Sequence, residues 1–571
     1  MKRGLDPDQG TSSSYPRSIK VMNFAAPWNN TCSTVGRVAR EGNVNLLNEL
    51  LRENKPVDVA DNRGWRPLHE AVASSIECLT VLLKHGGSDI NWTSHEGETA
   101  LLLACKRHEG CVASAFVNLL LEHGADPNIL DNEQDSPLLA AIRHKNRYVV
   151  QQLISAGANV NSADFSKWTP LHEAATKQDT AILELLLSKN AAIDVQDECG
   201  ITPIFTAAQH GFENCLKKLI SAAKERNRKD IIDMGAEDWA TPLMIAAQQG
   251  FVDCVKILLE AGADPDLKTS DNATALHLAV QGDNKLCAEI LMDKMKLDPL
   301  IKKFHPSTYV DTDMICPLHL AVEWKSYGSL QALIAGGFSP DSLYHCTEQN
   351  FLRILPYQPK SETALSFAVS KQDKKSIAVL LGAGASTNPP SRESSHPVAK
   401  AMLNPEPDIF NILIAAGTNI SHQRREGHTN EIFLYSLLTS KTYMKLLLYH
   451  GYDVNICFLA ESEIFYFIRC AATFLRREKI SLCEFSNLML KFLINTKKVQ
   501  DAFLKLNRQF EEDITDVINK LDQPTSLMRM CSIKIRQHLY SIHGVNLPCA
   551  IQNLDLPSLM KDFLSCRNDL M

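Results

Sequence analysis

The chain has 571 residues, of which 45% are hydrophobic and 22% charged, and its formal net charge is −7. This length exceeds what one hydrophobic core usually organises, so we expect several domains or a repeat array. The acidic balance gives no reason to expect nucleic acid or an anionic membrane as a partner, and no apolar run is long enough to predict a transmembrane helix.

Residues 1–30 are predicted to form a flexible leader. They contain Ser12-Ser13-Ser14 and several prolines, and they lack the apolar core of a secretory signal peptide. The sixteen cysteines are scattered from Cys32 to Cys566 without a Cys-x-x-Cys pair. This usage favours a reducing compartment, so we expect a cytoplasmic protein, with the nucleus as an alternative location.

A motif similar to Thr-Pro-Leu-His recurs along most of the chain and is complete at residues 169–172. Its third residue returns after 33 residues in several places: Leu68 and Leu101; Leu138, Leu171 and Ile204; Leu243 and Leu276. This spacing is the period of the ankyrin repeat, which consists of a β-turn followed by two helices. Longer intervals elsewhere indicate insertions between repeats, near residues 222–235 and 341–360.

Each repeat carries the signals for two helices. Proline suits the first helical turn because the N–H that it lacks has no partner there, and the threonine before it can cap the helix. A second apolar stretch with helical spacing, such as residues 255–259, ends at a Gly-Ala-Asp sequence whose glycine suits a left-handed C-cap. The sequence therefore predicts an all-α ankyrin-repeat solenoid of about eleven or twelve repeats over residues 31–458.

Two histidines of the motif invite a catalytic interpretation. His69 and His172 are each followed by glutamate, as in a zinc-protease helix, but Ala73 and Thr176 stand where the second metal ligand would be. We expect these histidines and the motif threonines to hydrogen-bond between neighbouring loops, as in the ankyrin repeats that this sequence resembles. Cysteines inside apolar helices should have raised pKa values and be poor nucleophiles. The sequence thus predicts no catalytic residue, no metal site and no cofactor.

The repeat signature fades beyond residue 458. Residues 459–521 keep apolar helical runs and are predicted to cap the last repeat. Pro524-Thr525-Ser526 then indicates the start of a new helix, in which Leu527, Cys531 and Ile535 lie four residues apart and share one face. After a loop, residues 554–564 form a second short segment. A stripe of this kind can also be ordinary core.

The tail at residues 522–571 resembles a SOCS box. The helix with Leu527 looks like its elongin-binding half, and the Leu-Asp-Leu-Pro sequence at residues 554–557 is similar to its cullin-selecting half. Together with the repeats, the chain from about residue 31 onward resembles the ankyrin repeat and SOCS box family. Two residues depart from the family pattern: Ser532 stands where arginine is usual, and Asp555 replaces the first proline of the cullin-selecting motif.

The resemblance implies a non-catalytic substrate receptor of a cullin–RING ubiquitin ligase. The repeats would bind an unidentified protein substrate, and the tail would recruit elongin B and elongin C, which bridge to a cullin of type five and a RING protein. The elongin-binding residues implied by the family are Leu527, Cys531 and Ile535, and the cullin-facing residues are Leu554, Leu556 and Pro557.

Trp65 and Trp168 are the candidate residues for substrate binding. Each stands just before the repeated motif, near the expected hairpin, and aromatic residues are favoured interface anchors. The alternative is that each tryptophan packs on the neighbouring finger, that is, on the hairpin turn of the adjacent repeat. For the whole chain, the alternative function is an ankyrin-repeat scaffold or adaptor without a link to a ligase. An enzyme would need pocket chemistry that no stretch of the sequence provides.

Overall fold

The computed structural model describes residues 33–107, 110–295, 316–345, 361–388, 396–420, 431–450, 452 and 461–481, and single positions at 485, 489, 502, 504 and 505. These residues divide into two compact units. The first comprises the described residues up to Ala207 together with Asn214–Ile231, and the second comprises Ala208–Glu213 and the described residues from Ile232 onward. The leader at 1–30 and the tail at 522–571 lie outside the described residues.

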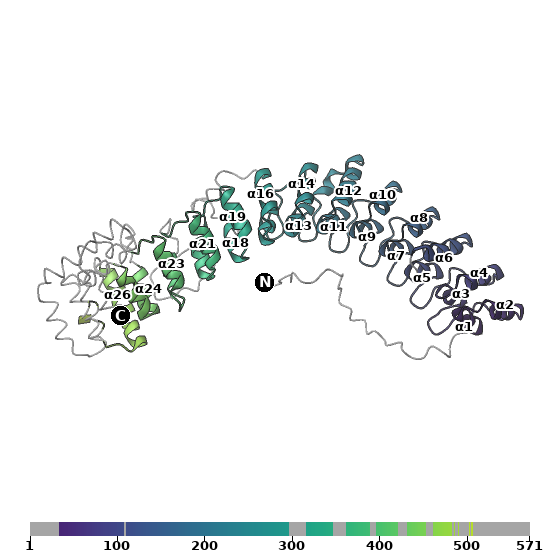
Figure 1. Ribbon diagram of the computed structural model, residues 1–571, viewed down its shortest axis with the longest axis horizontal. Helices are drawn as coiled ribbons and strands as arrows, with labels where there is room; N and C mark the ends of the chain where they lie inside the picture. The colour runs from purple at the N-terminus through teal and green to yellow at the C-terminus, as the bar shows by residue number, and fades with distance from the viewer. Residues whose placement is uncertain are drawn as a thin grey trace. The chain divides into compact units, whose positions relative to one another are not determined.

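The first unit is a series of helix pairs in which a short inner helix precedes an outer helix (Figure 1). The pairs are α1 (Thr34–Glu41) with α2 (Val44–Arg52), α3 (Pro67–Val72) with α4 (Ile76–His85), α5 (Ala100–Arg107) with α6 (Gly110–Glu122), α7 (Pro137–Arg143) with α8 (Arg147–Ser155), and α9 (Pro170–Thr176) with α10 (Thr180–Ser188). The division between the units falls within α11 (Pro203–Gln209), α12 (Glu213–Glu225) and the short 3-10 helix η2 (Lys229–Ile232).

The second unit continues the same alternation. Its helices are α13 (Pro242–Gln249), α14 (Val252–Ala261), α15 (Ala275–Gln281), α16 (Lys285–Lys294), α18 (Pro317–Glu323), α19 (Tyr327–Ala335), α20 (Ala364–Ser370), α21 (Lys374–Gly382), α22 (Pro397–Ala401), α23 (Asp408–Ala415), α24 (Glu431–Thr439), α25 (Lys441–Tyr449) and α26 (Glu461–Glu478). Strands β1 (Leu343–His345) and β2 (Ser361–Thr363) pair antiparallel, with Leu343 opposite Thr363. The predicted all-α ankyrin solenoid is confirmed, and this two-stranded ladder is a small addition to it.

The helix ends follow from the residues of the repeated motif. Proline occupies the first turn of α7, where the side chain of Ser136 accepts a hydrogen bond from the Leu139 N–H at 3.1 Å. Outer helices are capped in the same way by Asn146 and Asp179. Helix α14 ends at Gly262, whose φ of 99° confirms the predicted left-handed C-cap.

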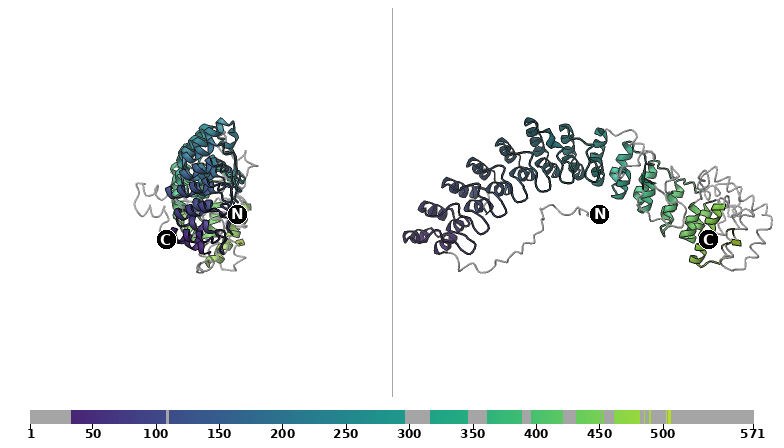
Figure 2. Two further views of the ribbon diagram at one scale, coloured as in Figure 1. Left: turned by 90° about the vertical axis from the view of Figure 1, so that its right-hand side faces the viewer. Right: turned by 180° about the vertical axis from the view of Figure 1, so that it is seen from behind.

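The core lies between the stacked helix pairs. In α7, residues 137–142 are all buried, whereas the outer helix α10 buries only one face, with Ile182, Leu183 and Leu186. Figure 2 shows the inner and outer helices of the first unit as two rows, with the fingers along one side. Buried thiols contribute to both units: burial raises the pKa of Cys215 and of Cys287 to about 11, so these cysteines are poor nucleophiles, as predicted.

Within the part of the chain that the structure describes, every helix is too short or too polar to cross a bilayer.

Candidate protein-interaction face

The fingers of the first unit are tight turns held by a side chain at their first residue. Asp164 Oδ1 accepts hydrogen bonds from the N–H groups of Ser166 and Trp168, both at 3.0 Å. Asp61, Asp131 and Asp197 hold their own turns with the same pair of contacts. This shared turn places the residue before each motif, including Trp65 and Trp168, beside the inner helix that follows.

Each fingertip is bonded to the next through the backbone. The N–H of His95 donates to the carbonyl of Arg63 at 2.9 Å, and the N–H of Phe165 donates to the carbonyl of Glu133 at 3.2 Å. The N–H of Glu198 continues the series with the carbonyl of Ser166 at 3.0 Å. The fingertips of the first unit therefore form one connected edge, which fixes the spacing of the side chains that they carry.

The motif histidines also join neighbouring fingers. His172 Nε2 donates to the carbonyl of Ile201 at 3.0 Å, and Thr169 Oγ1 donates to His172 Nδ1 at 2.8 Å. His69 Nε2 donates to the carbonyl of Glu98 at 3.1 Å. This confirms the predicted role of these residues as links between loops. Burial lowers the pKa of His172 to about 4, so its imidazole is neutral in the folded protein at pH 7.

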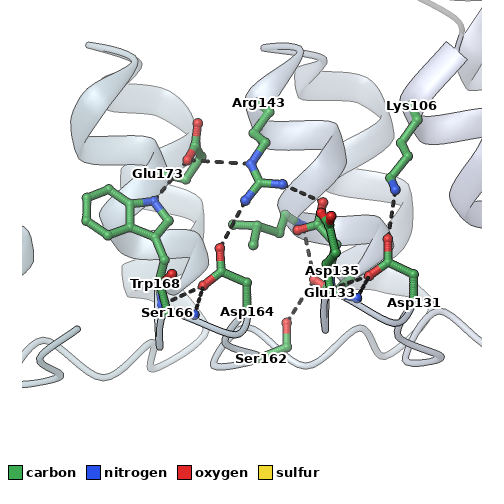
Figure 3. A network of polar contacts seen from close by, with 12 residues as sticks. Lys106, Asp131, Glu133, Asp135, Arg143, Ser162, Asp164, Ser166, Trp168 and Glu173 are labelled. Atoms are coloured by element: carbon green, nitrogen blue, oxygen red, sulfur yellow. Dashed lines mark hydrogen bonds and ion pairs between the residues drawn. The ribbon is translucent and has the colours of Figure 1, made fainter. Parts of the chain in front are cut away.

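Arg143 lies at the centre of a cluster of carboxylates (Figure 3). It projects from the end of α7 and forms ion pairs with Asp135 and with Asp164, the latter at 3.1 Å, and it lies 3.8 Å from Glu173 of α9. Lys177 reaches the other oxygen of Glu173 at 3.1 Å. The carboxylates are largely buried and the Arg143 side chain is 36% exposed, so the guanidinium covers them on the solvent side.

The cluster extends to Lys106, at the end of α5. Its ammonium contacts Asp131 at 2.7 Å and Glu98 at 3.2 Å. Burial alone would lower the pKa of Lys106, but the hydrogen bonds and charges of these two carboxylates outweigh burial and raise it. Burial raises the pKa of Asp135, and the positive charge of Arg143 opposes that rise only in part.

A second cluster repeats the arrangement at the start of the unit. Arg40, at the end of α1, contacts Glu70 of α3 at 2.5 Å, and Arg63 pairs with both Glu70 and Asp61. Arg40 and Glu70 are 30 residues apart, as are Arg143 and Glu173. The same contact between consecutive inner helices is thus built in two places, each next to a finger tryptophan.

Trp65 is a packed residue. It is only 6% exposed, and Arg63 and Arg107 lie over its ring at 3.8 and 4.9 Å from the ring centroid. Its ring also stacks on His69, with centroids 6.1 Å apart. The position of Trp65 favours the packing alternative, because its own arginines cover the surface that a partner would need.

Trp168 is half-buried. Its Nε1 donates to Glu173 Oε2 at 2.9 Å, and its ring stacks on His172 with centroids 4.8 Å apart. Figure 3 shows the indole beside the group formed by Arg143, Asp164 and Glu173. Trp168 therefore combines a fixed orientation with a remaining exposed surface.

The comparisons with known proteins agree with this repeat geometry. A family model that describes three consecutive ankyrin repeats matches the chain over overlapping ranges, at residues 35–131, 111–197, 171–269 and 243–343. Together these ranges cover more than half of the chain. A model of the SOCS box matches residues 523–565. The chain belongs to the ankyrin repeat and SOCS box family.

Relatives within this family are similar over a limited segment. Ankyrin repeat and SOCS box protein 3 is 46% identical in Homo sapiens and 44% identical in Bos taurus, in each case over 120 residues. Ankyrin repeat and SOCS box protein 2 of Homo sapiens is 30% identical over 123 residues, or 21% of this chain and 18% of the relative. For protein 3 the alignment covers 20% of this chain, and the chain spans about a fifth of the length of these curated relatives (22%).

The SOCS-box residues of this family member, Leu527, Cys531, Ile535, Leu554, Leu556 and Pro557, lie outside the described residues. The fingers also carry two exposed aromatic residues that the repeated motif does not single out. Phe165, at a fingertip of the first unit, is 70% exposed, and Trp239, in a finger of the second unit, is 66% exposed. Neither occupies the position immediately before the motif, where Trp65 and Trp168 stand. An alignment of the finger turns themselves identifies them.

Proposed function

We propose that this protein is a substrate receptor of a cullin–RING ubiquitin ligase and performs no bond chemistry itself. The observation that carries the proposal is the occurrence of a SOCS-box match at residues 523–565 in the same chain as the ankyrin repeats. In this proposal the repeats hold a substrate protein, and the SOCS box recruits elongin B and elongin C, which connect to a cullin of type five and a RING protein.

Positioning alone would provide the gain in rate. A substrate lysine tethered near a ubiquitin-loaded conjugating enzyme meets it at an effective concentration on the order of millimolar. A repeat array suits this role because its units stack on one another and present an extended surface. The connected fingertip edge of the first unit supports this argument, because its backbone bonds hold neighbouring fingers in register.

The elongin-binding residues in this proposal are Leu527, Cys531 and Ile535, and the cullin-facing residues are Leu554, Leu556 and Pro557. The test is co-expression of the full chain with elongins B and C, followed by size exclusion. The wild type should elute as a complex, and the double variant Leu527→Ala/Cys531→Ala should lose the elongins because buried anchors typically contribute about 2–4 kcal/mol. Circular dichroism that matches the wild type would show that the repeats of the variant remain folded.

Undiminished elongin binding by the double variant would exclude these residues as the anchor. Failure of the wild type to bind elongins would instead favour the alternative, an ankyrin-repeat scaffold in which the tail caps the array. Replacement of Asp555 by proline separates the two halves of the tail: elongin binding should be unchanged, and binding of a type-five cullin should increase if Asp555 weakens the choice of cullin.

For the substrate, we propose that the face around Arg143 and Trp168 takes part in binding. Arginine and tryptophan are the residue types most enriched among interface anchors, and both side chains keep exposed surface while their orientation is fixed by Glu173. A pull-down of substrate by Trp168→Phe and by Trp168→Ala tests the assignment: recovery equal to the wild type with Trp168→Ala would remove Trp168 from the interface.

A further inference from the structure

Trp239 is an exposed tryptophan held in a fixed turn. It occupies the fourth position of the finger before α13, with φ of 63°. The corresponding position in the first unit is glycine at residues 64, 97 and 200, and a polar residue with the same left-handed conformation at Gln134 and Lys167. Its N–H donates to the carbonyl of Ala236 at 2.8 Å, and Asp238 Oδ1 accepts from the N–H of Ala240 at 3.0 Å. A residue with a Cβ atom is disfavoured at positive φ, and a residue with a bulky side chain is disfavoured most of all. The turn nevertheless displays the largest aromatic side chain to solvent.

Other tryptophans of the molecule show what this ring lacks. In the first unit, Arg63 lies 3.8 Å from the centroid of Trp65, and Arg66 lies 3.5 Å from the centroid of Trp92. Among the described residues, by contrast, no arginine or lysine lies over the ring of Trp239, which is 66% exposed. The chain thus covers Trp65 and Trp92 with its own cations and bonds the half-buried Trp168 to Glu173, whereas the ring of Trp239 is left uncovered.

The charges around Trp239 have the sign that attracts a cation. Glu237 and Asp238 are exposed in the same finger, and the next finger is joined to it by the Ser270 N–H, which donates to the carbonyl of Asp238 at 2.9 Å. That next finger carries the exposed carboxylate of Asp271, with Lys268 as its exposed cation. Three carboxylates therefore lie in the turn of Trp239 and in the turn next to it. No ion pair in the described part of the chain neutralises them.

We propose that Trp239 receives an arginine or lysine side chain from a basic segment of the substrate protein, an inference that rests on the proposed function. The cation stacks on the indole, as Arg63 does on Trp65, and Glu237, Asp238 and Asp271 neutralise its charge. Cation–π contacts are strongest with tryptophan, and arginine is the more frequent partner. The substrate class is therefore a protein with an exposed basic segment.

The experiment uses the full chain purified with elongins B and C. The probe is a fluorescein-labelled decapeptide of alternating glycine and arginine, and the counter-probe has glutamate in place of arginine; binding is measured by fluorescence anisotropy. The arginine peptide should bind and the glutamate peptide should not. Trp239→Gly should weaken binding of the arginine peptide about tenfold, the effect expected for loss of an aromatic anchor.

The matched control is Asn272→Gly. Asn272 occupies the same position of the next finger, with φ of 62°, so this variant makes the same backbone change without removing an aromatic ring. It should bind the arginine peptide as the wild type does. Trp239→Gly places glycine at a left-handed position and should fold normally, with an unfolding midpoint no lower than that of the wild type.

Two results would overturn the proposal. Equal binding of the two peptides by the wild type would remove the preference for cations. Undiminished binding by Trp239→Gly, together with loss of binding by Glu237→Gln/Asp271→Asn, would reduce the site to electrostatic attraction without an aromatic anchor. Elongin association is scored in the same samples, so that a wild type without elongins refutes the proposed ligase function, whereas an elongin-bound wild type that ignores the arginine peptide refutes only the role of Trp239.

Discussion

The fingers of the two units treat tryptophan in opposite ways. In the first unit, Trp65 is buried beneath Arg63 and Arg107, and the indole N–H of Trp168 donates a hydrogen bond to Glu173. In the second unit, Trp239 stands exposed among carboxylates. One finger architecture can therefore hold a tryptophan either as a packed residue or as an exposed one. This difference predicts that substitution of Trp65 mainly changes stability, that substitution of Trp239 mainly changes binding, and that substitution of the half-buried Trp168 changes both.

The largest expected effect is that of Trp65→Ala. Loss of a nearly buried tryptophan leaves a cavity and removes the ring on which two arginines rest, so the local free energy of unfolding should fall by about 4 kcal/mol. Hydrogen exchange of peptides covering α3 and α5, followed by mass spectrometry, measures this quantity. Trp65→Phe is the control and should retain most of the protection. Unchanged exchange in Trp65→Ala would show that the ring is not part of the packing.

Acidification should weaken the link between α9 and the finger that follows it. The folded pKa of His172 is about 4 because burial disfavours the imidazolium, whereas its ordinary value is 6.5. The unfolded chain therefore binds more protons between these values, so stability is complete above pH 6.5 and is lost as the pH falls towards 4, by up to about 3 kcal/mol. Hydrogen exchange of peptides covering α9, scaled for intrinsic rates, follows the loss. His172→Gln should have lower stability at pH 7 but a flatter dependence on pH, and a slope equal to that of the wild type would contradict the assignment.

Trp168→Ala should have a smaller effect than Trp65→Ala. Its ring is only half-buried, so its loss should cost about 2 kcal/mol, including the hydrogen bond to Glu173. Glu173 keeps Arg143 and Lys177 as partners, which limits the damage. The measurement is again hydrogen exchange over α9, compared directly with Trp65→Ala over α3. A loss as large as that of Trp65→Ala would mean that exposure does not distinguish the two tryptophans.

The sequence predicts the helices of this protein better than it predicts the finger chemistry. Proline in the first turn, the capping residues and Gly262 act locally, so the 33-residue period and the helix ends can be read from neighbouring residues. The contacts of Arg40 with Glu70 and of Arg143 with Glu173 join residues 30 positions apart. They depend on how consecutive repeats stack, and the one-dimensional pattern does not contain that information.

The candidate site shows the same limit. The position immediately before the motif, which holds Trp65 and Trp168 in their fingers, is Ala240 in the finger of Trp239. Trp239 stands one position earlier, at the residue with positive φ, and only the geometry of the turn shows that this position points away from the inner helix towards solvent. Burial separates Trp65 from Trp168 in the same way, although their sequence contexts are nearly identical.

The smallest expected change in stability is that of Trp239→Gly, and it is the sharpest test of the contrast between the units. Removal of the side chain relieves a left-handed conformation that costs a residue with a Cβ about 1–2 kcal/mol. Glycine in turn gives the unfolded chain more freedom, which opposes folding by about 0.5–1 kcal/mol. The first term equals or exceeds the second, so urea unfolding followed by circular dichroism should give a midpoint equal to or slightly above that of the wild type. A clear loss of stability would mean that Trp239 packs against the protein in solution, and the distinction between covered and uncovered tryptophans would no longer hold.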